Sequence, residues 1–187
     1  MVSKIDTAWD LFLEGKTSEA KQLVEQDFSI DTCTDFSLLN LMGYLLLAEK
    51  DYASCIRIFE NYILFAQQNG DKEHEHIGLH QLAMIYRDQG DFHKALQLIE
   101  DEEKIVEEHF PNDNLKKAVN NYEQGYVRFK LNNLDEALTF MNLSLEQSLE
   151  TDDVISQACS YRGLGEICLA LEDTELSNRH FKRAIEL

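Results

Sequence analysis

The sequence predicts an all-α protein, a right-handed α-solenoid of about five helical hairpins that forms a single domain over residues 1–187. Three observations support this prediction. The chain contains only 8 Gly and 1 Pro in 187 residues, fewer than the tight turns of a strand-rich fold would need. One pattern of small, polar and apolar residues recurs five times. A short polar segment interrupts each copy, where one helix ends and the next begins.

The recurring pattern is a frame of fixed spacings that starts from a small residue. In the third copy, Ala83 is followed by Gly90 at +7, Ala95 at +12 and Ile99 at +16. A small residue (Ala, Gly, Ser or Cys) fills every zero and +12 position, and a large apolar residue fills every +16 position. Small residues let two antiparallel helices approach closely, and the +16 side chain fills the space beside them. The five frames start at Ala8, Gly43, Ala83, Gly125 and Gly165.

Polar turns within each frame separate the two helices of a hairpin, because they combine a residue that ends a helix with one that caps the next. The turns are Gly15-Lys16-Thr17, Lys50-Asp51, Gly90-Asp91, Asn132-Asn133 and Glu172-Asp173. The predicted helices are Lys4–Leu13 and Thr17–Asp27, Asp35–Ala48 and Tyr52–Gln68, Asp71–Gln89 and Phe92–Glu108, Asp113–Leu131 and Leu134–Leu149, and Asp153–Ala170 and Thr174–Leu187. The corresponding units are approximately residues 1–30, 34–70, 71–111, 112–150 and 152–187.

This frame resembles the tetratricopeptide repeat (TPR), whose signature has the same small, Gly, aromatic and Ala positions. The segment QLAMIYRDQGDFHKALQLIE is the closest match, and the resemblance covers nearly the whole chain. Three features depart from the family pattern: Arg128 replaces a bulky apolar residue, Ser177 replaces Ala, and Pro111 is the only candidate for the proline that closes a repeat. Units of about 40 residues resemble the long-helix subclass, found in bacterial peptide-pheromone receptors and kinesin light chains.

The resemblance implies that the first helix of each pair lines a concave groove that binds a protein or peptide segment. The inward face of that helix is expected at −6, −3, +1, +4 and +5 from each frame start, which includes Val2 in the first frame. Aromatic side chains supply contact area there, and Asn or Arg can hold an extended backbone. The predicted face is aromatic and faintly basic, and we expect Tyr126 to be mostly solvent-facing. Trp9, Phe12 and Leu13 are expected to pack on the neighbouring helix instead. The candidate groove residues are Asn40, Tyr44, His80, Met84, Arg87, Tyr122, Tyr126, Phe129 and Arg162.

The charge of the chain excludes two classes of partner. With 17 Lys and Arg against 35 Asp and Glu, the net charge of −18 repels phosphate backbones and anionic lipid, so no nucleic acid and no membrane partner is expected. The acidic residues are interpreted as a solvated exterior. The N-terminus has no secretory signal, and the four cysteines form no CxxC pair, which predicts a cytoplasmic protein with reduced thiols.

One cluster of acidic and histidine residues has the spacing of metal ligands on a helix. Glu73, His76 and His80 share a helical face, but Gly78 stands where a second His of an HExxH motif would lie. We interpret the cluster as a solvated helix start, because acidic residues favour that end of the helix dipole. The sequence contains no Gly-rich phosphate loop and no nucleophile elbow. We therefore expect no metal, no cofactor and no enzymatic activity.

Two functions remain from the sequence. The first is a binding scaffold or adaptor, and the alternative is a regulatory, peptide-sensing receptor that acts through a conformational change. A homodimer through the C-terminal unit is also predicted, from an apolar stripe of Leu176, Phe181, Ala184 and Ile185 that needs cover. Two alternative interpretations of the stripe are also open. The chain could be cut from a longer protein, or the stripe could face its own hairpin partner, with Arg179, Lys182 and Arg183 outside.

Overall fold

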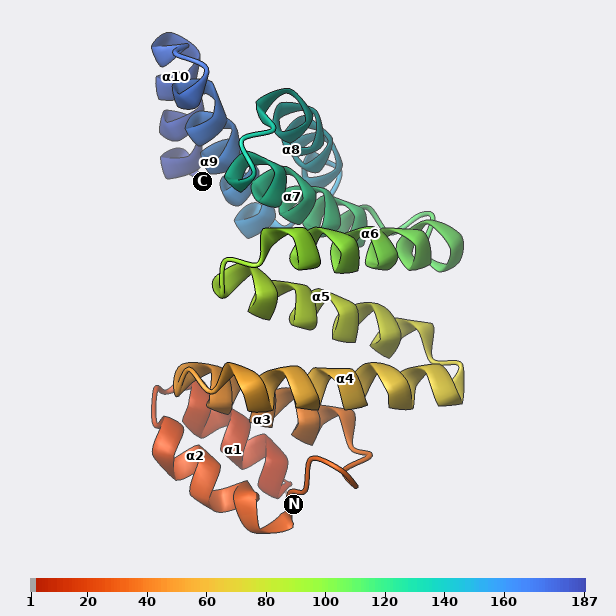
Figure 1. Cartoon of the computed structure of the whole chain (residues 1–187). Coiled ribbons are helices and arrows are strands. Elements are labelled where there is room, and N and C mark those ends of the chain that lie inside the picture. Colours follow the sequence, from red (N-terminus) through yellow and green to blue (C-terminus); the bar gives the residue numbers. More distant parts are fainter. Residues whose placement is uncertain (1–2) are drawn as a thin grey trace. The chain divides into compact units, whose positions relative to one another are not determined.

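A computed structural model of the chain describes residues 3–187, which form ten α-helices, one short 3-10 helix and no strand (Figure 1). The all-α class is confirmed. Every predicted helix is present with ends within about one residue of the prediction, except that the second helix finishes in the 3-10 turn η1 (Glu25–Asp27). The α-helices are α1 (Lys4–Leu13), α2 (Thr17–Val24), α3 (Phe36–Ala48), α4 (Tyr52–Asn69), α5 (Lys72–Asp88), α6 (Phe92–His109), α7 (Asn114–Lys130), α8 (Leu134–Leu149), α9 (Val154–Ala170) and α10 (Thr174–Glu186).

The helices form two compact units, Met1–Gln89 with α1 to α5 and Gly90–Leu187 with α6 to α10. Within each unit, every helix packs against the next one along the chain. First-of-pair helices also contact one another, α1 with α3 in the N-terminal unit and α7 with α9 in the C-terminal unit. These contacts are those of stacked helical hairpins. The boundary between the units lies in the turn of the third predicted hairpin, and a single domain stays a prediction.

The glycines that start two of the frames show why the frame needs a small residue at its zero position. A Cβ on Gly43 would lie 2.5 Å from the ring of Phe59, and one on Gly165 would lie 2.7 Å from the ring of Phe181. Both aromatic residues occupy the +16 position of the same frame. The zero position therefore has to be small because the +16 side chain occupies the space where its own side chain would be.

The +12 position carries a second contact that explains one departure from the family pattern. The Ser177 hydroxyl donates a hydrogen bond of 2.8 Å to the Gly165 carbonyl oxygen, and the Cys55 thiol lies 3.4 Å from the Gly43 carbonyl oxygen. Each bond joins the +12 residue to the zero residue of its own frame. Ser177 therefore replaces Ala without leaving a buried hydroxyl unsatisfied.

The +7 residue ends the first helix of each hairpin in a left-handed conformation. Gly15 and Gly90 have φ angles of +79° and +82°. Lys50, Asn132 and Glu172 occupy the same position with φ angles of 61°, 63° and 64°. The turn geometry is thus the same in all five frames, although only two frames use the residue that adopts it without steric cost.

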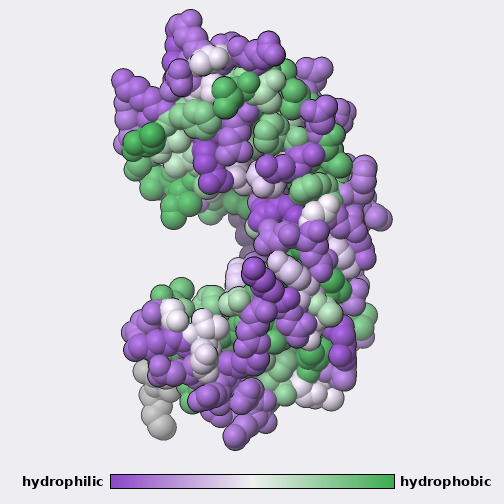
Figure 2. Space-filling view, turned by 60° about the vertical axis from the view of Figure 1, so that its left-hand side comes forward, coloured by the Kyte–Doolittle hydropathy of each residue, from purple (hydrophilic) through white to green (hydrophobic). Residues whose placement is uncertain are grey.

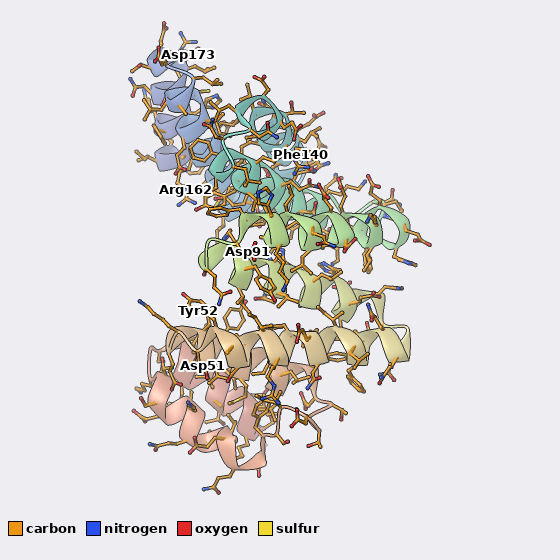
Figure 3. The ribbon with its side chains drawn as sticks, in the orientation of Figure 1. Asp51, Tyr52, Asp91, Phe140, Arg162 and Asp173 are labelled. Carbon is orange, nitrogen blue, oxygen red and sulfur yellow. The ribbon has the colours of Figure 1, made fainter. Side chains whose placement is uncertain are left out.

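Aspartates cap most of the helices. Asp51, Asp91 and Asp173 precede α4, α6 and α10, where each carboxylate accepts a backbone N–H from three residues further on (Figure 3). Asp35, Asp71, Asp113 and Asp153 cap α3, α5, α7 and α9 in the same way. Asn133, the predicted cap of α8, makes no such side-chain bond.

A row of buried polar side chains on α7 explains the other departure. Asn120, Gln124 and Arg128 are one turn apart, and each is hydrogen-bonded to the next: Gln124 donates to Asn120 over 3.1 Å, and Arg128 donates to Gln124 over 2.6 Å. Asn120 also donates to the Ile99 carbonyl oxygen on α6 over 3.0 Å. The row therefore connects two helices through side chains whose hydrogen bonds are made inside the protein.

Arg128 itself joins three helices of the C-terminal unit. Its guanidinium lies 3.1 Å from the Glu100 carboxylate of α6 and 2.9 Å from that of Glu136 on α8. It also lies 4.2 Å from the centre of the Phe140 ring, which Figure 3 labels on α8. These contacts let a charged residue occupy a position that is usually bulky and apolar, because its charge is paired and its flat face is packed.

Candidate functional site

Four of the predicted groove residues come together in the C-terminal unit, on the adjoining faces of α7 and α9. Arg162 of α9 donates a hydrogen bond of 2.9 Å to the Tyr122 hydroxyl of α7. The rings of Tyr122 and Tyr126 are 6.3 Å apart and nearly parallel. Phe129 and both tyrosines pack against a buried cluster, so their positions are fixed from behind. The cluster consists of Ala137, Met141, Leu164 and Ile167.

Tyr126 is more buried than the sequence suggested. It is half-buried, because its ring packs against the core cluster as well as against Tyr122, and the expectation of a mostly solvent-facing ring was wrong. The Lys130 ammonium lies 5.0 Å from the Tyr126 ring and 5.1 Å from the Phe129 ring. A cation therefore borders the aromatic surface at the C-terminal end of α7.

The pair of Arg162 and Tyr122 gives this face a fixed positive charge. Burial raises the pKa of the Tyr122 phenol, although the hydrogen bond from Arg162 acts in the opposite direction. The hydrogen bond with Tyr122 raises the pKa of the Arg162 guanidinium, so at neutral pH the pair is a neutral phenol and a cation. The Arg162 side chain is 56% exposed and projects from α9 (Figure 3). Glu166, one turn further along α9, lies 3.8 Å from it.

Two cavities open beside this pair. One of about 190 Å³ lies between α7 and α9 and is lined by Val119, Tyr122, Ile155 and Cys159 among others. A second of about 520 Å³ lies between α9 and α10, and Cys159 and Arg162 line it on the α9 side. Arg162 and Cys159 thus lie where the face of α7 and α9 continues toward α10.

Ile155 was not among the predicted groove residues, although it is 72% exposed and lines the smaller cavity. It lies one helical turn before Cys159 and on the same side of α9, at −10 from the frame start. Leu115 has the equivalent position on α7 and is also exposed. Extending the inner-face periodicity by one turn, as helices of this length require, would have included both residues.

The other five predicted residues belong to the N-terminal unit. Tyr44 of α3 packs against Trp9 and Phe12 of α1, with ring centres 5.9 Å apart in both cases, and its hydroxyl accepts a hydrogen bond of 2.9 Å from Gln81. Asn40 lies one turn before Tyr44, and its buried side-chain oxygen has no hydrogen-bond partner. The aromatic residues of α1 are therefore used in packing, and the orphaned amide oxygen belongs to the same helix as Tyr44.

Three of these residues lie on α5. His80, Met84 and Arg87 are all half-buried, and the Arg87 guanidinium is 3.2 Å from the Asp88 carboxylate. Trp9 and Phe12 pack on α3 as predicted. Leu13, the last residue of α1, does not pack on a neighbouring helix, because it is 77% exposed. Val2, which the inner-face pattern also includes, lies outside the described residues.

The cluster of Glu73, His76 and His80 lies on α5, where the His76 imidazole is 3.9 Å from the Glu73 carboxylate. Residues 3–187 contain no group of three or more His, Cys, Asp or Glu side chains placed to hold a metal ion. In the part of the chain that the structure describes, every helix is too short or too polar to cross a bilayer. All four cysteines are free thiols.

Comparison with known protein families identifies the repeat. Two family models described as tetratricopeptide repeat match the chain, over residues 78–101 and 114–187, and together they cover just over half of it. A search of curated protein sequences finds no match.

Several solved structures have the same fold. BtubC (BKLC) from P. vanneervenii aligns with a TM-score of 0.78 and 16% identity, over 96% of this chain and 76% of that one. A Podosopora anserina kinesin light chain candidate with nearly identical TPR-like repeats aligns with a TM-score of 0.76 and 14% identity, over 98% and 92%. MamA from Desulfovibrio magneticus RS-1 aligns with a TM-score of 0.66 and 16% identity, over 98% and 92%. At these identities the likeness concerns the fold.

Proposed function

This chain is a tetratricopeptide repeat protein, and we propose that it is a scaffold or adaptor that binds a protein or peptide segment on the faces of its first-of-pair helices. The fold is consistent with protein–protein interaction, and repeats of this family are in general non-catalytic. The proposed binding residues are Asn40, Tyr44, His80, Met84 and Arg87 in the N-terminal unit and Tyr122, Tyr126, Phe129 and Arg162 in the C-terminal unit. A second copy of the chain is the other proposed partner, through α9 and α10. Free thiols fit the proposed cytoplasmic location.

The observation that carries the proposal is the arrangement of Arg162 beside the cavity of about 190 Å³. An apolar cavity next to a fixed, exposed cation favours a segment that presents an apolar side chain and a carboxylate close together. Tyr122 holds the Arg162 side chain in place before the ligand arrives, which lowers the entropy cost of binding. The net charge of −18 makes this local cation more distinctive.

Asn40 supports binding in the N-terminal unit. A buried amide oxygen without a partner costs about 1–3 kcal/mol of stability, so a native protein that keeps one usually has another use for it. After a small rotation of the side chain, this oxygen could accept a backbone N–H from an extended segment. Asn40→Leu should therefore leave the free energy of unfolding unchanged or higher while weakening the binding of a peptide.

The test is selection from a random peptide library, followed by affinity measurement for the enriched peptides. Arg162→Ala should weaken binding by roughly tenfold, as expected for one charged contact of an interface. Arg57→Ala is a matched control on the outer helix α4, because the two arginine side chains are 56% and 57% exposed. Peptides that bind the two variants equally well, or a library that yields no common pattern, would contradict the proposal.

Hydrogen exchange separates the scaffold from the peptide-sensing alternative. If the chain is a scaffold, a bound peptide should protect only the helices that it contacts. A receptor that works by conformational change should show altered exchange in helices of both units, including outer helices such as α4 that present no binding residue. Protection confined to α7 and α9 would thus exclude the receptor role for that peptide.

A further inference from the structure

We infer that the hairpin of α9 and α10 is a two-fold interface at which a second copy of this chain binds. The inference deepens the proposed function, because it names the surface and the symmetry of the proposed self-association. It concerns the cavity of about 520 Å³, whose α10 side consists of Phe181, Ala184 and Ile185.

The equivalent surface is covered by another helix in the hairpin before. Met141 and Ser144 of α8 occupy the same frame positions, +16 and +19, as Phe181 and Ala184, and both are fully buried. A Cβ on Gly163 of α9 would lie 2.5 Å from the Met141 side chain, and the hydroxyls of Ser144 and Ser160 are 2.8 Å apart. The helix α9 therefore lies directly on this part of α8.

The N-terminal unit repeats the arrangement. Phe59 and Tyr62 of α4 occupy +16 and +19, and both are buried. A Cβ on Gly78 of α5 would lie 2.7 Å from the Ile63 side chain and 2.9 Å from the Tyr62 ring. In both hairpins this surface of the outer helix receives a helix that places a glycine against it, so the surface is shaped to receive an α-helix.

On α10 the same positions are uncovered. Phe181 and Ala184 are only half-buried, and Ile185 at +20 is 85% exposed. Phe181 partly fills the space beside Gly165, so the alternative in which the stripe faces its own hairpin partner holds for that ring and not for Ile185. Figure 2 shows apolar side chains gathered on the surface of the C-terminal unit, in the upper half of the view.

The distribution of exposed apolar residues favours a second copy as the occupant. Among the residues that the structure describes, twelve large apolar side chains are exposed, and seven of them lie in the last hairpin. The first hairpin contributes one, Leu13. Four of the seven, Val154, Ile155, Ile185 and Leu187, lie at the end of the hairpin where α9 begins and α10 ends, the end at which Ile185 lines the cavity. The same end of another copy presents a matching apolar surface, and contact between the two identical surfaces makes a two-fold interface rather than a head-to-tail one. The seven residues are Val154, Ile155, Leu169, Leu171, Leu176, Ile185 and Leu187.

The distribution of charge along the chain also favours a second copy as the occupant of this surface. Residues 154–187 carry four Lys and Arg and five Asp and Glu, a net charge of −1, so the other −17 of the chain's −18 lies in residues 1–153. Two copies of so acidic a protein repel each other over most of their surface, and this hairpin is the region where they can approach. It also carries a self-complementary pair. Arg162 and Glu166 lie one turn apart at the cavity, so antiparallel packing of two copies can set Arg162 beside Glu166 of the partner subunit.

The experiment is sedimentation equilibrium of the full chain from about 1 to 200 μM, a range that detects weak association. The wild-type chain should fit a monomer–dimer equilibrium. Ile185→Asp should raise the dissociation constant at least tenfold, because it places a charge in the centre of an apolar contact. Leu64→Asp is the control, since Leu64 is 51% exposed on α4, outside the hairpin, and should change the constant less than about twofold. Circular dichroism confirms that both variants are folded.

Charge reversal tests the symmetry. Arg162→Glu and Glu166→Arg should each weaken the dimer, and the double variant should recover most of the lost affinity because the pair is restored across the two-fold axis. A monomer at all concentrations, equal effects of Ile185→Asp and Leu64→Asp, or a mass that keeps rising as in a head-to-tail filament would each overturn the inference. Tyr126 lies on α7, outside this hairpin, so Tyr126→Ala should weaken peptide binding without affecting the dimer. A failure of the peptide-binding proposal can therefore be told apart from a failure of the dimer proposal.

Discussion

Tyr44 and Tyr126 occupy the same position, +1, in the second and fourth repeat frames, and the two units use them differently. In the N-terminal unit, Tyr44 packs against two aromatic residues of α1, and Gln81 donates a hydrogen bond to its hydroxyl. In the C-terminal unit, Tyr126 stacks on Tyr122, next to an exposed arginine and a cavity of about 190 Å³. One residue type at one repeat position thus completes an aromatic cluster between two hairpins in one unit, and in the other it packs on the core beside Tyr122, which holds Arg162 and lines a cavity.

The cores of the two units also differ, in the polarity of the side chains that they bury. The buried residues of α3 are apolar throughout, whereas α7 buries Asn120, Gln124 and Arg128 in one connected row. The repeat therefore requires small residues at its helix contacts and leaves the rest of each helix free to vary. In the C-terminal unit, those other positions leave the Arg162 side chain exposed and two cavities open beside it.

The largest effect should come from truncating the packed tyrosine. Tyr44→Ala should lower the free energy of unfolding by about 2–4 kcal/mol, because it removes two aromatic contacts and a hydrogen bond. Tyr126→Ala should cost less, about 1–2 kcal/mol, since its ring stacks on the single aromatic ring of Tyr122 in addition to its contact with the core cluster. Urea denaturation of both variants checks this. Equal losses would show that the two units do not differ in how they use this position.

The polar row of α7 gives the next test. Arg128→Ala should lower the free energy of unfolding by about 2 kcal/mol, since it leaves the Gln124 side-chain oxygen without its donor and uncovers the Phe140 ring. Arg128→Met should recover part of that loss, because it keeps the packing volume without a charge to desolvate. The measurement is chemical denaturation at neutral pH. An alanine variant as stable as the wild type would mean that the row is incidental to the C-terminal unit.

The aspartate caps are shared by both units and should make both sensitive to acid. Hydrogen bonds from Ser54 lower the pKa of Asp51, those from His74 lower that of Asp71, and those from Ser156 lower that of Asp153. Because the folded pKa values lie below the unfolded value of about 3.9, the stability that they contribute is complete above that pH and lost as pH falls through the lowered values.

A single cap isolates this effect. Asp153→Ala should cost about 1 kcal/mol at neutral pH, as other N-cap truncations do. Asp153→Asn keeps a capping oxygen that does not titrate, so its stability should depend less on pH than that of the wild type below about pH 4. Thermal melting between neutral and acidic pH measures both variants. If the melting temperature of the wild type fell with pH in parallel with that of the asparagine variant, the role of the ionised carboxylate would be contradicted.

The smallest effect concerns the left-handed turn residues. Lys50→Gly in the N-terminal unit and Glu172→Gly in the C-terminal unit should each raise the free energy of unfolding by about 0.5–1 kcal/mol, because glycine adopts a φ near +60° without strain. Asn132→Gly should gain less, since Asn tolerates this conformation. Gly90→Ala, at a φ of +82°, should destabilise by a similar amount and serves as the reverse control.

The sequence by itself determined the helices and the frame. Helix ends depend on local groups, such as Asp153 before α9 or Gly90 after α5, whose partners lie within four residues. The contacts between the zero, +12 and +16 positions could also be predicted from the sequence, because the two helices of a hairpin are joined by a short turn. A contact such as that between Gly165 and Phe181 therefore recurs at one spacing in each unit. Half of the candidate site was predictable for the same reason: the inner-face spacing placed Tyr122, Tyr126 and Arg162 on one side of their helices.

Only the tertiary structure decided which of these residues are accessible. The bond between Arg162 and Tyr122 spans 40 residues, and that between Gln81 and Tyr44 spans 37, so neither follows from a local spacing. Whether Leu13 is covered, whether Arg128 finds Glu100 and Glu136, and whether Ile155 borders a cavity depend on the neighbouring helix that packs there. Exposure is a property of that packing, because the same amphipathic face is buried when a second helix lies on it and becomes a binding surface when none does.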